Sequence, residues 1–308
     1  MGYVFALIAV LCGATKGFCG KKISGYTSEL KSAAFANFLR MTLCILIGFF
    51  FVLFDTSVGI GGLAASGQVV GISLISGIST SVFVISWLLA IRRGAFMMVD
   101  VFLTVGVVIP MILSNIFYGE PIGLNDGIGV ALLLVAAAIM CSYSSGIKQK
   151  VRLGDILLMS LSGAANGFVS FSQKMFVNNG EGSSATVFNF YTYVFSAAVL
   201  LAFYLISTYT EKRATVAAEG GKVPEKKGMP LSVLAYVTAM AICLFAHSFF
   251  NTLAAQQLSA AELYPLSQGL ALTLASIMAA VFFGEKIKLR SVIGIAITFV
   301  GLLVINLL

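Results

Sequence analysis

The chain has 308 residues, of which 59% are hydrophobic and only 10% are charged, and its formal net charge is +7. This composition, with a mean hydropathy of +1.01, excludes a water-soluble globular protein, because such a protein needs far more charge on its surface. Apolar runs of about 20 residues, each long enough to cross a hydrocarbon core of roughly 30 Å, cover almost the whole chain. The sequence therefore predicts an all-α polytopic membrane protein.

Ten apolar segments are expected to cross the membrane, separated by stretches that contain charged residues, Gly, Pro and Ser. No basic stretch and cleavage site mark the first segment as a signal peptide, so we expect it to be retained as a span. The only sizeable connector covers residues 209–230. In chain order the predicted segments are residues 2–20, 32–54, 69–91, 95–117, 123–144, 154–177, 184–208, 231–255, 260–283 and 289–308.

The basic residues are distributed unevenly between the loops. Most of the 19 lie in loops that follow odd-numbered segments, and loops that follow even-numbered segments contain none. The positive-inside rule then places the odd-numbered loops in the cytoplasm and both termini outside. Three basic residues fall within segments, namely Lys16, Arg40 and Lys174.

Two stretches far apart in the chain are nearly the same. Residues 117–135 read FYGEPIGLNDGIGVALLLV and residues 282–300 read FFGEKIKLRSVIGIAITFV, so nearly half of the positions are identical. Five segments separate the two copies, and the second copy must therefore enter the membrane in the opposite direction. This inversion explains why only the second turn is basic, because only that turn faces the cytoplasm.

A second match extends the repeat to the first segment of each half. Residues 11–18 (LCGATKGF) match residues 161–168 (LSGAANGF), which places Lys16 opposite Asn166. The sequence therefore predicts ten transmembrane helices arranged as two inverted five-helix repeats, covering residues 1–146 and 152–308. Inverted repeats of this kind are typical of transporters that bind their solute near the middle of the bilayer.

This pattern resembles the EamA-type branch of the drug/metabolite transporter superfamily. The resemblance covers the whole chain and depends on the two repeats, each closing with an aromatic-Gly-Glu turn (FYGE at 117–120, FFGE at 282–285) and a Gly/Ala-rich last segment. It implies a substrate cavity lined by the first four segments of each half, with the fifth segments as an outer scaffold. Members move amino acids, sugars, nucleotide sugars, purines, drugs and other polar metabolites. They are often drawn with cytoplasmic termini, whereas the basic loops here predict the opposite.

Polar side chains within the segments are candidates for solute contact, because an unsatisfied polar group is costly in a membrane. His247 and Asn251 are four residues apart and share a helix face, and their repeat counterparts, Phe83 and Trp87, offer an aromatic wall. Structural hydrogen bonding and, for His247, proton coupling are the alternatives. The predicted substrate-binding residues are Lys16, Phe83, Trp87, Asn166, His247, Asn251, Tyr264 and Gln268.

The charged residues within the segments have competing interpretations. Lys16 is expected either to extend to the cytoplasmic face or to face the cavity and attract an anionic group, whereas Arg40 and Lys174 are expected to extend toward a membrane surface. Asp100 and Glu262 lie near segment starts, where an anion stabilises a helix. Proton coupling by these two carboxylates is the alternative.

The repeated Gly-Glu turns have a structural interpretation. Gly119 and Gly284 are expected to end their helices in the left-handed conformation. Glu120 and Glu285 are then expected near the start of the following helix, where the helix dipole favours an anion.

The sequence gives little support to enzyme chemistry. It has one histidine and lacks GxSxG and Walker-type motifs, and its five cysteines fall in apolar runs without CxxC spacing, so we expect no catalytic residue, metal or cofactor.

We predict a secondary transporter of a small polar organic metabolite, such as an amino acid, sugar or nucleobase, that works by alternating access in the plasma or inner membrane. The alternatives are a proton-coupled multidrug exporter and, less favoured, a membrane protein without transport activity. Small multidrug exporters carry an essential acid in the first segment, where this chain has Thr15 and Lys16. The expected partners are a small solute and the lipid bilayer but no nucleic acid, and a monomer would suffice.

Overall fold

The structure is a computed structural model that describes residues 1–27, 29–54, 63–93, 96–141, 152–180, 182–217, 229–284 and 289–307. The regular elements within these ranges are helices, and these ranges contain no strand. Residues 142–151, where the predicted boundary between the two halves falls, lie outside the described residues. The helices are α1 (Gly2–Ile23), α2 (Leu30–Phe54), α3 (Gly67–Arg93), α4 (Phe96–Gly106), α5 (Val108–Tyr118), α6 (Leu124–Cys141), α7 (Leu153–Asn179), α8 (Ala185–Ala217), α9 (Leu231–Ala255), α10 (Ala260–Phe283) and α11 (Leu289–Leu307).

The ten predicted segments correspond to these helices, and the fourth is divided at Val107 into α4 and α5. Pro110 explains the interruption, because it lacks the N–H group that would bind the carbonyl of Gly106. Helix α7 approaches closely at the same point. A Cβ atom on Gly106 would lie 2.1 Å from the carbonyl oxygen of Gly163, so only glycine allows the two backbones to come so near.

Seven of the described helices are long and apolar enough to cross a membrane, namely α1, α2, α3, α7, α8, α9 and α10. Shorter apolar stretches occupy Phe102–Tyr118, Leu124–Ala136 and Val292–Ile305. Large apolar side chains are exposed on the outside of the bundle, for example Phe50, Leu205 and Val281. A lipid bilayer accounts for both the apolar helices and the exposed apolar side chains. Its hydrocarbon chains solvate apolar side chains, and they require the backbone to be hydrogen-bonded within helices.

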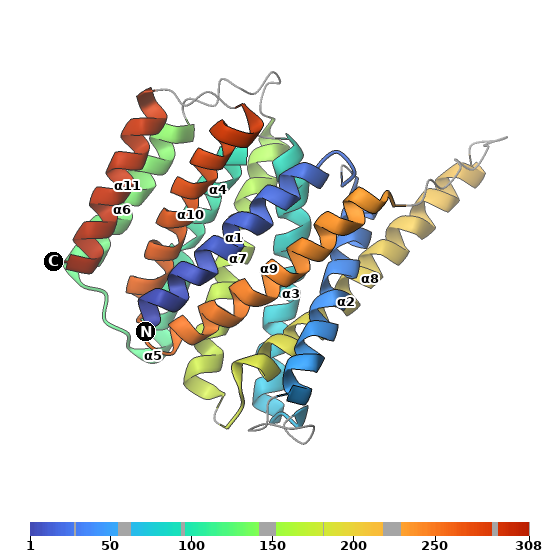
Figure 1. Cartoon of the computed structure of the whole chain (residues 1–308), viewed down its shortest axis with the longest axis horizontal. Helices are drawn as coiled ribbons and strands as arrows, with labels where there is room; N and C mark the ends of the chain where they lie inside the picture. The colour runs from blue at the N-terminus through green and yellow to red at the C-terminus, as the bar shows by residue number, and fades with distance from the viewer. Residues whose placement is uncertain are drawn as a thin grey trace.

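The two halves run in opposite directions. In Figure 1, α1 rises from the N-terminus while its counterpart α7 descends, and α2, α3 and α6 are likewise opposed to α8, α9 and α11. Both termini lie at the same end of the bundle. The prediction of two inverted five-helix repeats is confirmed.

The packing of the helices follows the same symmetry. The pair α1 and α9 corresponds to the pair α3 and α7 when the halves are exchanged, and both pairs are in extensive contact. Helices α2 and α8 pack on each other, as do α4 and α10, and α6 and α11. The last pair forms one edge of the molecule in Figure 1, outside the main bundle. This position agrees with the outer scaffold expected for the fifth helix of each half.

The Gly-Glu turns end their helices as expected. Gly119 and Gly284 cap α5 and α10 in the left-handed region, each with φ of 65°, where glycine is favoured because it has no Cβ atom. Glu285 lies outside the described residues.

Candidate functional site

A cavity lies between the two halves and encloses about 810 Å³ of atom-free space, counting the part open to solvent. Its walls come from α1, α3 and α4 of the first half and from α7, α9 and α10 of the second. These two sets of helices are counterparts in the repeat. A smaller adjoining space shares several wall residues and extends toward α8. Among the described residues, none from α6 or α11 lines either space.

Nine of the ten predicted site residues line this cavity, and Glu262 does not. The nine come from six helices that are distant in sequence, so the fold brings the predicted set together. Solute contact itself stays a prediction. The nine are Lys16, Phe83, Trp87, Asp100, Asn166, His247, Asn251, Tyr264 and Gln268.

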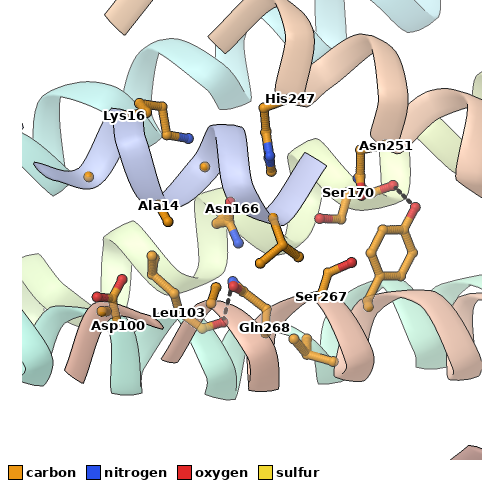
Figure 2. Close-up of a pocket in the computed structure, with 18 of the residues that line it drawn as sticks. Ala14, Lys16, Asp100, Leu103, Asn166, Ser170, His247, Asn251, Ser267 and Gln268 are labelled. Atoms are coloured by element: carbon orange, nitrogen blue, oxygen red, sulfur yellow. Dashed lines mark hydrogen bonds between the residues drawn. The ribbon is translucent and has the colours of Figure 1, made fainter. Parts of the chain in front are cut away.

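One end of the cavity offers hydrogen-bond acceptors. The Nδ1 atom of His247 lies 2.7 Å from the carbonyl oxygen of Ala9, and because a carbonyl only accepts, Nδ1 carries the hydrogen and Nε2 is left as an acceptor. Asn251 donates its Nδ2 hydrogen to Oε1 of Gln173 at 2.6 Å. The buried Oδ1 atom of Asn251 has no donor among the described residues. Figure 2 shows His247 and Asn251 one after the other along the same wall.

On the opposite wall, two side chains of α10 contact backbone carbonyl groups of neighbouring helices. The hydroxyl of Tyr264, a residue only 2% exposed, donates to the carbonyl oxygen of Ser170 at 2.6 Å, and Nε2 of Gln268 lies 3.4 Å from the carbonyl oxygen of Leu103. Both contacts appear as dashed lines in Figure 2. Tyr264 and Gln268 thus connect α10 to α7 and α4 at the cavity wall.

The other end of the cavity carries a cation. Lys16 is only 8% exposed, and its Nζ lies 5.5 Å from the ring centre of Phe83 and 5.9 Å from that of Trp87. None of the described residues accepts a hydrogen bond from this ammonium group. Gly20 makes room for the indole, because a Cβ atom there would lie 2.5 Å from Trp87. Of the two alternatives for Lys16, the structure therefore favours the side chain that faces the cavity.

The prediction that Arg40 extends to a membrane surface is wrong. The residue is 1% exposed, and none of its three guanidinium nitrogens has a hydrogen-bond partner among the described residues. Helix α2 packs against α3, α8 and α9, so its buried face, which also carries Asn37, Met41 and Cys44, points into the protein. The side chain is directed away from lipid and cannot reach the headgroups.

The prediction for Lys174 is also wrong. This residue is 3% exposed, and its Nζ donates to Oε1 of Glu120 at 2.8 Å and to the carbonyl oxygen of Leu258 at 2.6 Å. The other carboxylate oxygen of Glu120 accepts from the backbone N–H of Ala260 at 2.6 Å. Glu120 therefore stabilises the start of α10 rather than the start of α6, and the ion pair connects the two halves.

Glu262 lies at the first turn of α10. Its Oε2 accepts from the backbone N–H of Ser259 at 3.0 Å, and its own N–H donates to the Ser259 hydroxyl at 3.2 Å. This is a capping box, and the spacing Ser-x-x-Glu in the sequence is its signature. Glu262 therefore stabilises the start of α10, and it does not line the cavity.

Sequence reasoning missed several residues of the cavity. Ser170 and Gln173 lie on α7 one and two turns beyond Asn166 and share its face, so helical spacing from Asn166 was the signal that pointed to them. Ser267 on α10 also lines the cavity, and its buried hydroxyl has no partner among the described residues.

Comparisons with known proteins agree with this architecture. A model of the EamA-like transporter family matches the chain twice, over residues 1–142 and 153–307. The fold recurs in 28 solved chains, one of which is described as "Crystal structure of protein" and superposes with a TM-score of 0.71. That match covers 99% of this chain and 96% of the other at 14% identity, so it establishes the fold alone. No curated protein matches the chain. Because the family model covers almost its whole length, the chain belongs to the EamA-like transporter family and is a multi-pass membrane transporter of the drug/metabolite transporter superfamily.

Proposed function

We propose that this transporter moves a small polar organic solute by alternating access. The observation that carries the proposal is the cavity between the halves, whose two walls come from counterpart helices of an inverted repeat. Exchange of the conformations of two inverted halves opens a central site to either side of the membrane in turn.

The chemistry of the walls supports a polar solute. His247 Nε2 and Asn251 Oδ1 are acceptors that lack a donor among the described residues, and a solute with N–H or O–H groups would satisfy them. Phe83 and Trp87 would pack against its apolar or planar part. An apolar drug would leave the acceptors unsatisfied, at a cost of about 1–3 kcal/mol for each buried group.

The alternative of a proton-coupled multidrug exporter receives less support. Such an exporter of cationic drugs would benefit from an acid at the centre of the cavity. Here a lysine, Lys16, lines the cavity from the second half of α1, and the acid among the described lining residues, Asp100, lies on α4.

Solute counterflow in proteoliposomes tests the proposal. Purified protein is reconstituted and loaded with each member of a panel of amino acids, sugars, sugar acids, nucleobases and organic cations, and uptake of the labelled solute is measured. We expect uptake of at least one polar solute, with Trp87→Ala, Asn251→Ala and Gln268→Ala each lowering the rate. Phe50→Ala, at an exposed position on α2, is the control for an aromatic residue lost outside the cavity. Undiminished uptake in all three cavity variants would contradict the assignment of the site.

The orientation in the membrane is part of the proposal. The basic residues favour cytoplasmic placement of the loops after the odd-numbered segments of the ten predicted from the sequence, with both termini outside, in the plasma or inner membrane. Ser183, in the turn between α7 and α8, follows the sixth of these segments and would then face outward. A Ser183→Cys variant in a cysteine-free background should react with a membrane-impermeant maleimide in intact cells, and protection from the reagent would reverse the orientation.

A further inference from the structure

Two basic side chains, those of Lys16 and Arg40, are buried in this protein. Lys16 on α1 is 8% exposed and Arg40 on α2 is 1% exposed. The two charges are near enough to repel each other, and Asp100 is the acid whose charge attracts Lys16. Among the described residues, these two cations and one acid leave a net positive charge.

Burial of these charges is costly. A charge buried in a protein or membrane interior needs a partner of opposite charge or several hydrogen bonds. The guanidinium nitrogens of Arg40 have no hydrogen-bond partner among the described residues, and the described contacts of the Lys16 ammonium are with two aromatic rings. An anion that enters the cavity would pair with the Lys16 ammonium and would reduce the electrostatic cost of the buried Arg40 charge.

The geometry determines which cation is within reach. Lys16 lines both spaces of the cavity, and Figure 2 shows it on the same side as His247, with Asp100 on the opposite wall. Arg40 does not line either space; it lies on α2, which packs against α8, the helix that contributes Tyr193 to the smaller space. Lys16 is therefore placed to touch a solute, whereas Arg40 acts through the positive potential that it adds.

We propose that the transported solute carries a carboxylate or phosphate group, that the Lys16 ammonium binds this group, and that Arg40 is a positioning residue that strengthens the attraction. The anionic group lies at the Lys16 end, and N–H or O–H groups of the same solute reach the acceptors of His247 and Asn251. This inference rests on the proposed transport function and deepens it by naming the class of solute.

Matched pairs of solutes provide the test. The pairs are glycerol 3-phosphate and glycerol, gluconate and glucose, and orotate and uracil. Counterflow and thermal stabilisation are measured with the full-length protein in phosphatidylcholine vesicles and repeated in vesicles that contain phosphatidylglycerol. We expect an anion to be exchanged and to stabilise the protein in preference to its neutral partner, in both lipids.

The variants separate a binding role from a structural one. Lys16→Gln should weaken the apparent affinity for that anion by about tenfold or more, because a charge-assisted hydrogen bond is lost, and Lys16→Arg should restore most of it. Arg40→Gln should produce a smaller loss. The matched control is Lys22→Gln, because Lys22 Nζ also lies over two rings, 5.4 Å from Phe18 and 5.5 Å from Phe283, but outside the cavity. Lys22→Gln should leave the affinity unchanged.

The outcomes distinguish this inference from the proposed function. Exchange of only neutral or cationic solutes, at rates that Lys16→Gln does not alter, would overturn the anion site while transport stands. Stabilisation seen only with phosphatidylglycerol, without exchange of any anion, would assign the charge pair to a lipid headgroup and would also overturn it. Failure to exchange any solute of any charge would instead contradict the transport function.

Discussion

Two buried lysines of this protein, Lys174 and Lys16, have opposite environments. Lys174 is 3% exposed and donates to the Glu120 carboxylate and to the carbonyl oxygen of Leu258. Lys16 is 8% exposed, faces a cavity and has aromatic rings as its described contacts. The first charge is neutralised within the protein and stabilises the contact between the halves. The charge of Lys16 faces the cavity and is available to bind an anionic solute.

The repeat makes this comparison sharper. The counterpart of Lys16 in the second half is Asn166, and both line the cavity. Small residues maintain the shared scaffold, as at Gly163 and Gly167, where a Cβ atom would meet the backbone of α4. The two halves therefore agree in helix packing and differ in the charge that they present to the cavity.

Loss of the paired lysine should have the largest effect on stability. Lys174→Met leaves the Glu120 carboxylate without its cation in a largely buried position, and removal of one partner of a buried pair costs about 3–5 kcal/mol. Thermal unfolding of the purified protein measures this loss. Glu120→Gln combined with Lys174→Met should cost less than the sum of the two single changes, and strict additivity would contradict the pairing.

Loss of the unpaired lysine should not destabilise the empty protein. Lys16→Met removes a buried charge and its repulsion with Arg40, so the free energy of unfolding should stay the same or rise by about 1 kcal/mol. The same unfolding assay without solute provides the measurement. Destabilisation of Lys16→Met similar to that of Lys174→Met would erase the distinction between the two lysines.

The aromatic contacts of Lys16 should contribute less than its charge. Trp87→Phe keeps an aromatic ring but weakens the cation–π contact, which is worth about 0.5–2 kcal/mol for indole, so the affinity for the solute should fall by roughly threefold. Concentration-dependent counterflow measures the change. A loss as large as that in Lys16→Gln would indicate that Trp87 binds the solute directly and strongly.

Glu262 should give the smallest effect. Glu262→Gln keeps a side chain that accepts in a capping box, so stability should fall by about 0.5 kcal/mol or less, and the pH dependence of transport should not change. Asp100→Asn, at the cavity wall, is the matched comparison for proton coupling. A shift of the pH profile in Glu262→Gln alone would assign proton coupling to Glu262 at the start of α10.

The fold could be predicted from the sequence because its signals are local or repeated. Apolar runs identify the helices, and the FYGE and FFGE turns identify the two halves. The left-handed caps at Gly119 and Gly284 follow from the same turns. Helical spacing and the repeat also selected residues that the fold brings to one cavity, such as His247 and Asn251.

The environments of Arg40 and Lys174 could not be predicted in the same way. Both were expected to extend to a membrane surface, and each depends on which face of its helix meets other helices. The partners of Lys174 lie on the turn before α6 and on the connection between α9 and α10, far away in the sequence. Pairing over such distances is a property of the tertiary packing, which no local pattern records.

Accessibility of the cavity from both sides of the membrane tests the central claim most directly. Ser170, which lines both spaces of the cavity and is labelled in Figure 2, is replaced by cysteine in a cysteine-free background and exposed to an impermeant thiol reagent in right-side-out and inside-out vesicles. We expect reaction from both sides, with protection when a transported solute is present. Reaction from one side only, unaffected by any transported solute, would contradict alternating access.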